Sequence, residues 1–133
     1  MNAKRRTRTQ LEESFHKRWD FRTAILTEED ELWTEHLETE RDCGERFYQG
    51  LLWLMNNSQN KKVLVVCHGG ILKFGMDGHE SISVMHDRIG DGIRFKNCEL
   101  REYDMTWSTT LNDSISSSHE FRPHITLTEI IEK

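Results

Sequence analysis

The chain has a single proline, Pro123, and no apolar run near the 18 residues that a membrane-spanning helix needs. Its three cysteines, Cys43, Cys67 and Cys98, are odd in number, widely spaced and form no C-x-x-C pair. This pattern indicates neither a disulfide framework nor a zinc site. We also find no signal peptide, so we expect a soluble, cytoplasmic chain with no membrane partner.

Apolar side chains are also scarce. They make up 35% of the 133 residues, and the mean hydropathy is −0.73. At this length we predict a single domain over residues 1–133, with a basic segment at 1–20 and a serine-rich loop and tail at 108–133. The seven histidines are numerous, but none lies with cysteine or carboxylate at metal-ligand spacing. We therefore expect no metal and no cofactor.

Charge is plentiful and segregated along the chain. Residues 1–22 carry seven Lys or Arg against three acids, whereas residues 27–45 carry nine acids against one arginine. The basic run "KRRTR" is open to three interpretations: a nuclear-localisation or nucleic-acid patch, a solvated terminus, or arginines of an anion pocket. Because the net charge is −5 and no RNA- or DNA-binding motif is present, we expect no nucleic-acid partner.

The stretch "VLVVCHGG" carries the strongest local signal. Residues 63–67 form a continuous, β-branched apolar run, which predicts a strand covered on both faces in a parallel sheet. Chemistry in such sheets lies just past the carboxyl ends of the strands, where His68 falls. Gly69 and Gly70 would allow a tight turn and close ligand approach, and the helix that follows would favour an anion. The alternative is that His68 only caps a helix while the glycines make the turn.

A second signal precedes this run. Thr39 and Asp42 have the spacing of a capping box and predict a helix over 40–56. Its apolar stripe should pack on the sheet and consists of Phe47, Leu51 and Leu54, widened by Tyr48, Leu52 and Met55. Residues 97–105 predict a second strand, and "HITLTEII" a short terminal element. We therefore predict an α/β fold with strand 63–67 at its centre.

Three blocks in this order resemble the C-terminal half of the histidine phosphatase superfamily: "EDELWTEHLETERDCGERFYQGLLWLM", "VLVVCHGG" and "RFKNCELREYD". The phosphoglycerate mutase-like group is the most similar, over about residues 20–105. The resemblance implies a partial three-layer α/β sandwich with a mostly parallel sheet, lacking the N-terminal strand. It also implies phosphoryl transfer or hydrolysis of a phosphate ester through a phosphohistidine, with a phosphorylated small molecule or phosphate anion as the partner.

The resemblance also implies roles for single residues. His68 matches the second histidine of the family, which is catalytic and holds the phosphoryl oxygens, and Gly69 follows it as in the family. Arg5 and Arg6 would bind phosphate, with a free basic end as the alternative. Glu12 and Glu13 are the nearest candidates for a general acid, and neither is assigned. Further family matches are expected to be structural, with Arg46 on the helix and Asn97 and Glu99 satisfying loop backbone groups.

One departure from the family dominates the functional expectation. The R-H-G motif that carries the nucleophile is absent, and the only His-Gly pair is His68-Gly69. We therefore expect the chain to be inactive alone. Three hypotheses stay open: a phosphatase or mutase that lacks its nucleophile, a phosphate-binding pseudoenzyme, or a truncated fragment that another polypeptide completes. Without the neighbouring strand, we expect the edge at 63–67 to self-associate or to be covered by residues 1–20.

Overall fold

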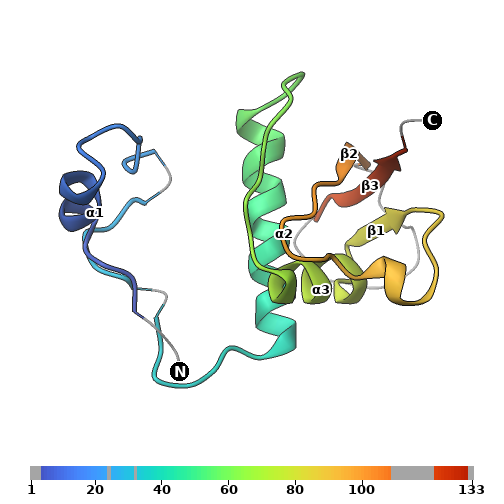
Figure 1. Ribbon diagram of the computed structural model, residues 1–133, viewed down its shortest axis with the longest axis horizontal. Helices are drawn as coiled ribbons and strands as arrows, with labels where there is room; N and C mark the ends of the chain where they lie inside the picture. Colours follow the sequence, from blue (N-terminus) through green and yellow to red (C-terminus); the bar gives the residue numbers. More distant parts are fainter. Residues whose placement is uncertain (1–3, 24, 32, 109–121, 132–133) are drawn as a thin grey trace. The chain divides into compact units, whose positions relative to one another are not determined.

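The computed structural model describes residues 4–23, 25–31, 33–108 and 122–131. They fall into two compact units, Met1–Glu38 and Thr39–Lys133. The first contains one short helix, and the second contains two longer helices and a sheet (Figure 1). That the whole chain forms one domain stays a prediction.

The short helix of the first unit, α1 (Arg8–Ser14), begins with a complete capping box. The backbone N–H of Gln10 donates to Oγ1 of Thr7 over 3.2 Å, and the N–H of Thr7 donates to Oε1 of Gln10 over 3.1 Å. Two of the N–H groups that a helix start leaves unpaired are satisfied in this way. The basic segment at 1–20 therefore contains one short helix.

The two oppositely charged stretches of the sequence meet within this first unit. Lys4 lies 3.5 Å from Glu29, and Arg8 lies 3.6 Å from Glu28. The backbone N–H of Arg5 donates to Oδ2 of Asp30 over 2.8 Å. The basic run thus pairs with the acidic stretch that follows it in the chain.

The second unit begins with α2 (Glu40–Asn57), which confirms the predicted helix 40–56 to within one residue. Oγ1 of Thr39 accepts the backbone N–H of Asp42 over 3.1 Å, as the capping-box spacing predicts. The helix then supplies two core residues, Tyr48 and Leu51. Phe47, Leu52 and Leu54 pack against that core, so the predicted apolar stripe is confirmed.

The next helix, α3 (Gly69–Gly78), packs closely on α2. Glycine makes this approach possible at Gly75, where a Cβ atom would lie only 2.3 Å from Cδ1 of Phe47. At Gly44, a Cβ atom would lie 3.0 Å from the carbonyl oxygen of Phe74. The backbone of α3 at Gly75 therefore lies against the ring of Phe47, and the backbone of α2 at Gly44 lies against the carbonyl group of Phe74.

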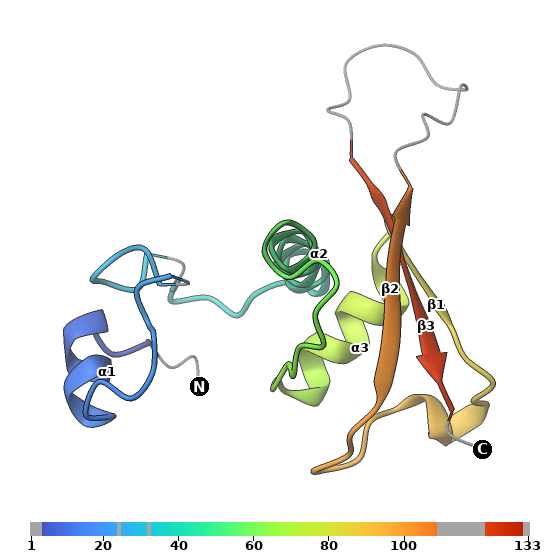
Figure 2. The same ribbon diagram turned by 90° about the horizontal axis from the view of Figure 1, so that it is seen from above.

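The sheet has three strands, β1 (Ile82–Met85), β2 (Glu102–Ser108) and β3 (His124–Ile130), in the order β1-β3-β2. β1 pairs with β3 in parallel, and β2 pairs with β3 antiparallel. The predicted α/β class is confirmed, and the sheet is mixed rather than mostly parallel. In Figure 2, α2 and α3 both lie on the same side of the sheet. The predicted serine-rich loop and tail at 108–133 includes β3, and residues 109–121 lie outside the described residues.

A small core joins these elements. Its buried members come from α2, β1 and β3, and they are Tyr48, Leu51, Ile82, Ile125 and Leu127. Tyr48 is fully buried, and its hydroxyl donates to the carbonyl oxygen of Pro123 over 2.6 Å. Its polar end therefore has a partner inside the core, as a buried tyrosine requires.

The prediction of a buried central strand at 63–67 is wrong. This segment has no regular secondary structure and joins α2 to α3 as a drawn-out loop (Figure 1). Its apolar side chains are largely exposed: 44% for Val63, 73% for Leu64, 55% for Val65 and 87% for Val66. An apolar, β-branched run becomes a buried strand only when neighbouring strands pair with it and helices cover it. Among the described residues, no strand pairs with this segment.

Candidate phosphate site and adjoining cavity

His68 lies at the junction between the exposed loop and α3. It is the N-cap residue of the helix, with extended backbone angles of φ −91° and ψ 150°, and its side chain makes no capping hydrogen bond. The residue is exposed. The alternative in which His68 merely caps the helix is therefore not supported by its side chain.

The backbone angles at the two residues that follow, Gly69 and Gly70, do not require glycine. Both lie in the first turn of α3, and neither has a positive φ. A Cβ atom at Gly69 or Gly70 would meet no described atom within 4 Å. Neither backbone conformation nor packing among the described residues requires glycine here. What the glycines leave is an open approach to the first N–H groups of α3, which carry partial positive charge.

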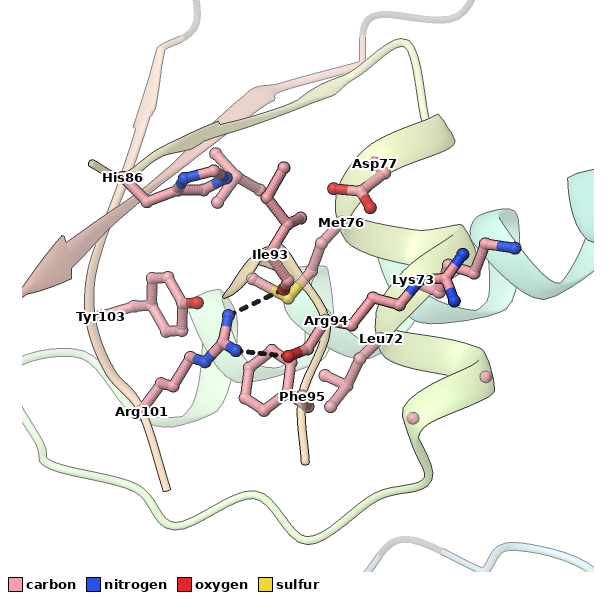
Figure 3. A pocket seen from close by; sticks show the side chains of 13 residues that line it. Leu72, Lys73, Met76, Asp77, His86, Ile93, Arg94, Phe95, Arg101 and Tyr103 are labelled. Carbon is pink, nitrogen blue, oxygen red and sulfur yellow. Dashed lines mark hydrogen bonds between the residues drawn. The ribbon is translucent and has the colours of Figure 1, made fainter. Parts of the chain in front are cut away.

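A cavity of about 270 Å³ adjoins this helix start (Figure 3). One wall is a face of α3. The others come from β1 and the residue after it, from the end of the 3-10 helix η1 (Gly90–Ile93) and the loop that follows, and from β2 and the residue before it. The lining residues are Gly69, Gly70, Leu72, Lys73, Met76, Asp77, Val84, His86, Ile93, Arg94, Phe95, Arg101 and Tyr103.

Two cations of this lining are available for an anion. Lys73 is exposed and its ammonium lies 4.9 Å from the ring centroid of Phe74, and Arg94 is also exposed. Neither forms an ion pair with another described residue. In Figure 3 the side chain of Arg94 points from its loop toward α3, the helix that carries Lys73. Asp77, one turn beyond Lys73, contributes the opposing negative charge.

Arg101 is the third cation of the lining, and it builds the wall of the cavity. Its side chain is only 2% exposed. The guanidinium donates to the carbonyl oxygens of Ile93 over 2.8 Å and Arg94 over 2.7 Å (Figure 3). It also stacks 4.0 Å from the ring centroid of Phe95. Its donors are thus used within the chain, and its role is to hold the loop over the cavity.

Glu99 supports the same wall. Nε of Arg101 donates to Oε1 of Glu99 over 2.8 Å, and the backbone N–H of Lys96 donates to Oε2 over 2.6 Å. These hydrogen bonds, that of Arg101 first, lower the pKa of Glu99 to about 2. The expectation that Glu99 satisfies loop backbone groups is confirmed.

The other predicted site residues lie in the first unit. The guanidinium of Arg5 donates to the carbonyl oxygens of Arg6, Glu28 and Glu29, over 2.8, 3.3 and 2.6 Å. Nη1 of Arg6 donates to Oγ of Ser14 over 3.3 Å. Arg5 therefore has a structural use in its own unit. Phosphate binding by Arg5 and Arg6 stays a prediction.

The two glutamates near the start of the chain differ in their surroundings. Oε1 of Glu12 lies 2.8 Å from Nε of Arg22 in an ion pair, and Glu13 is exposed. The ion pair gives Glu12 a partner within its own unit, and neither glutamate is assigned as a general acid.

Lys73, Arg94 and Arg101 were missed in the sequence analysis. Lys73 could have been predicted from the sequence, because residues 69, 73 and 76 repeat at the helical spacing that places side chains on one face. Arg94 lies in a loop and Arg101 directly precedes β2, and the positions of both depend on tertiary contacts, so no local pattern marks them.

In the described part of the chain, no helix is long and apolar enough to cross a membrane. No group of three or more His, Cys, Asp or Glu residues in the same ranges has the arrangement of a metal site.

Comparison with known proteins gives one match. The family model for the histidine phosphatase superfamily (branch 1) matches residues 2–110, well over half of the chain. The matched range includes His68, both glycines and every residue that lines the cavity. No curated protein and no solved structure matches the chain.

Proposed function

Because the chain belongs to the histidine phosphatase superfamily, we propose that it binds the phosphate of a phosphate ester at His68 and the N-terminus of α3. The observation that carries this proposal is the open, glycine-flanked position of His68. Its side chain is exposed and makes no capping hydrogen bond, and the two following glycines serve no backbone or packing need among the described residues.

The proposed chemistry is electrostatic. A phosphate at this helix start would accept hydrogen bonds from the first backbone N–H groups of α3, where the helix dipole favours negative charge. A protonated His68 would donate a charge-assisted hydrogen bond to a phosphoryl oxygen. In phosphoryl transfer, charge accumulates on the equatorial oxygens of the transferring group. A donor fixed at that place therefore stabilises the transition state more than the ground state.

Binding is the proposed activity of these 133 residues, without turnover. A nucleophilic histidine must stand about 3–3.5 Å from the phosphorus and in line with the leaving group. His68 cannot serve as nucleophile while it holds the equatorial oxygens. No R-H-G motif supplies a second histidine within this sequence.

A second candidate is a phosphatase or mutase half-site that another polypeptide segment completes. The exposure of Val63 to Val66 favours it, because this run has the composition of a buried strand and has no strand beside it among the described residues. A segment that paired there would end beside His68, where a nucleophile is needed.

The proposed phosphate site is tested by titrating the purified chain with inorganic phosphate and following amide chemical shifts. We expect the largest shifts at Gly69 and Gly70. His68→Ala should weaken binding about tenfold, the effect of losing one charge-assisted hydrogen bond. Lys61→Ala, a charge removed from the same exposed loop but outside the cavity, should leave the affinity unchanged.

Hydrolysis of p-nitrophenyl phosphate by the same samples decides the question of turnover. We expect no release above background. Turnover that His68→Ala abolishes would contradict the binding-only proposal and reveal a nucleophile in this chain. Phosphate affinity that is equal in wild type and His68→Ala would contradict the site itself.

A further inference from the structure

We infer that the cavity beside α3 selects aryl phosphates, by seating a single aromatic ring while the phosphate lies at the helix start. This inference rests on the proposed function and names the class of ester that the site takes. It is carried by the size, lining and charge of the cavity.

The cavity has the right size for one ring. A cavity of about 150 Å³ is enough to hold benzene. At about 270 Å³, this one has room for a ring together with its ester oxygen and a small substituent. Gly69 and Gly70, which follow His68 in the chain, are among its lining residues. A ligand with its phosphate at the helix start can therefore place its next atoms directly in the cavity.

The lining favours an apolar body. Five of the lining side chains are apolar and come from α3, β1, η1 and the loop after it: Leu72, Met76, Val84, Ile93 and Phe95. A sugar in this position would leave several hydroxyl groups without partners, which is costly in an apolar setting. Asp77, His86 and Tyr103 offer polar atoms for one substituent, but not for a polyhydroxylated body.

The charge of the rim fits a dianionic head group. Lys73 and Arg94 are exposed and have no ion-pair partner among the described residues. Lys73 follows Gly69 by four residues, which places it one helical turn further along the same face of α3. The cation Arg101 is not available, because its guanidinium is committed to the loop carbonyl groups.

Hydrogen bonds within the chain hold one wall of the cavity in place. Arg101 donates to the carbonyl oxygens of Gly92, Ile93 and Arg94 over 2.7–2.9 Å, so three consecutive residues of the loop are fixed by one side chain. Glu99 fixes that side chain in turn. A preformed site loses less conformational entropy when it binds, which favours rigid ligands such as an aromatic ring.

The test compares dissociation constants of the purified chain for inorganic phosphate, glycerol 1-phosphate and phenyl phosphate, by calorimetry. We expect phenyl phosphate to bind about tenfold or more tightly than the other two, from the apolar area that the ring buries. Phenol should bind far more weakly than phenyl phosphate, because it lacks the charge.

Two sets of variants locate the effect. Val84→Phe should fill the cavity and remove the preference for phenyl phosphate, while the affinity for inorganic phosphate is unchanged. Lys73→Ala/Arg94→Ala should weaken phenyl phosphate and inorganic phosphate alike, and the matched Lys61→Ala/Lys96→Ala should weaken neither. If Val84→Phe does not fold, the affinities of the wild-type chain for 1-naphthyl and 9-anthracenyl phosphate are compared instead. The anthracenyl ring system exceeds the cavity, so 9-anthracenyl phosphate should bind less tightly than 1-naphthyl phosphate.

The outcomes separate this inference from the proposed function. Equal affinities for phenyl phosphate and glycerol 1-phosphate, both weakened by His68→Ala, would overturn the aryl preference and keep the phosphate site. Affinities that His68→Ala does not change would overturn the phosphate site. A preference for phenyl phosphate that persists in Val84→Phe, or that is equal for all ring sizes, would overturn the placement of the ring in the cavity.

Discussion

Glu45 on α2 accepts hydrogen bonds from Arg122, Gln49 and His79. The Nε2 atom of Gln49 lies 2.8 Å from Oε1, Nε2 of His79 lies 3.0 Å from Oε2, and Nη2 of Arg122 contacts Oε1. Because Nδ1 of His79 accepts the backbone N–H of Ser81 over 3.1 Å, Nε2 carries the proton and donates to Glu45. These contacts, that of Arg122 first, lower the pKa of Glu45 from 4.5 to about 2.

The lowered pKa predicts an acid sensitivity at this residue. A carboxyl group with a folded-state pKa below its unfolded value stabilises the fold above about pH 4.5, and that contribution is lost as the pH falls toward about 2. Glu45→Gln should lower stability at pH 7 and reduce its loss between pH 4.5 and 2. The pKa of Glu99 is also lowered to about 2, so part of the pH dependence of stability remains in this variant.

Urea unfolding at pH 7 and pH 3 measures this effect, with the exposed Glu80→Gln as the control variant. The control should follow the wild type at both pH values. A Glu45→Gln variant with the same pH dependence as wild type would show that the three hydrogen bonds do not stabilise the folded state.

At the scale of the elements, the contact between α2 and α3 depends on Gly75. A methyl group there would lie 2.3 Å from two ring atoms of Phe47, so the helices must move apart or the ring must leave its rotamer. Overpacking at this site should cost about 1–3 kcal/mol. The gain of about 1 kcal/mol in helix propensity offsets part of this cost, so we expect Gly75→Ala to destabilise the fold by up to about 2 kcal/mol.

Gly50→Ala is the matched control, since it lies in the interior of α2 and its Cβ atom would meet nothing described within 4 Å. It should stabilise the chain by about 0.5–1 kcal/mol in the same urea titration. The packing argument fails if Gly75→Ala raises the stability as Gly50→Ala does.

Elements with a complete local signal were predictable from the sequence. The capping residues Thr39 and Asp42 and the apolar stripe after them specify α2 without knowledge of the rest of the chain. The run at 63–67 is the opposite case, because a strand takes its hydrogen bonds from a neighbour that its own residues do not specify. The wall that Arg101 builds could not be predicted either, since it joins the residue before β2 to η1 and the loop after it.

At the scale of the molecule, the exposed loop predicts self-association. Leu64 and Val66 are 73% and 87% exposed. Exposed apolar side chains that lie close together in the chain form a patch that favours contact with another copy. We expect the wild type to associate in size-exclusion chromatography with light scattering, and Leu64→Lys/Val66→Lys to shift it toward monomer.

The control for this experiment is Leu26→Lys/Leu37→Lys, two substitutions at apolar residues of similar exposure, 79% and 77%, in the first unit. They should leave the oligomeric state of the wild type unchanged. A wild-type chain that is a monodisperse monomer would refute the predicted self-association.

The same loop has a consequence for how long the chain lasts in a cell. Exposed segments without regular structure are preferred sites of proteolytic nicking, because a protease needs an accessible backbone to cut. Cleavage between residues 61 and 67 would separate α2 from His68, α3 and the sheet. Degradation depends on how often the cut site is open, and here it is open in the folded state itself. A second copy or another chain that bound over this loop would therefore lengthen the half-life of the chain.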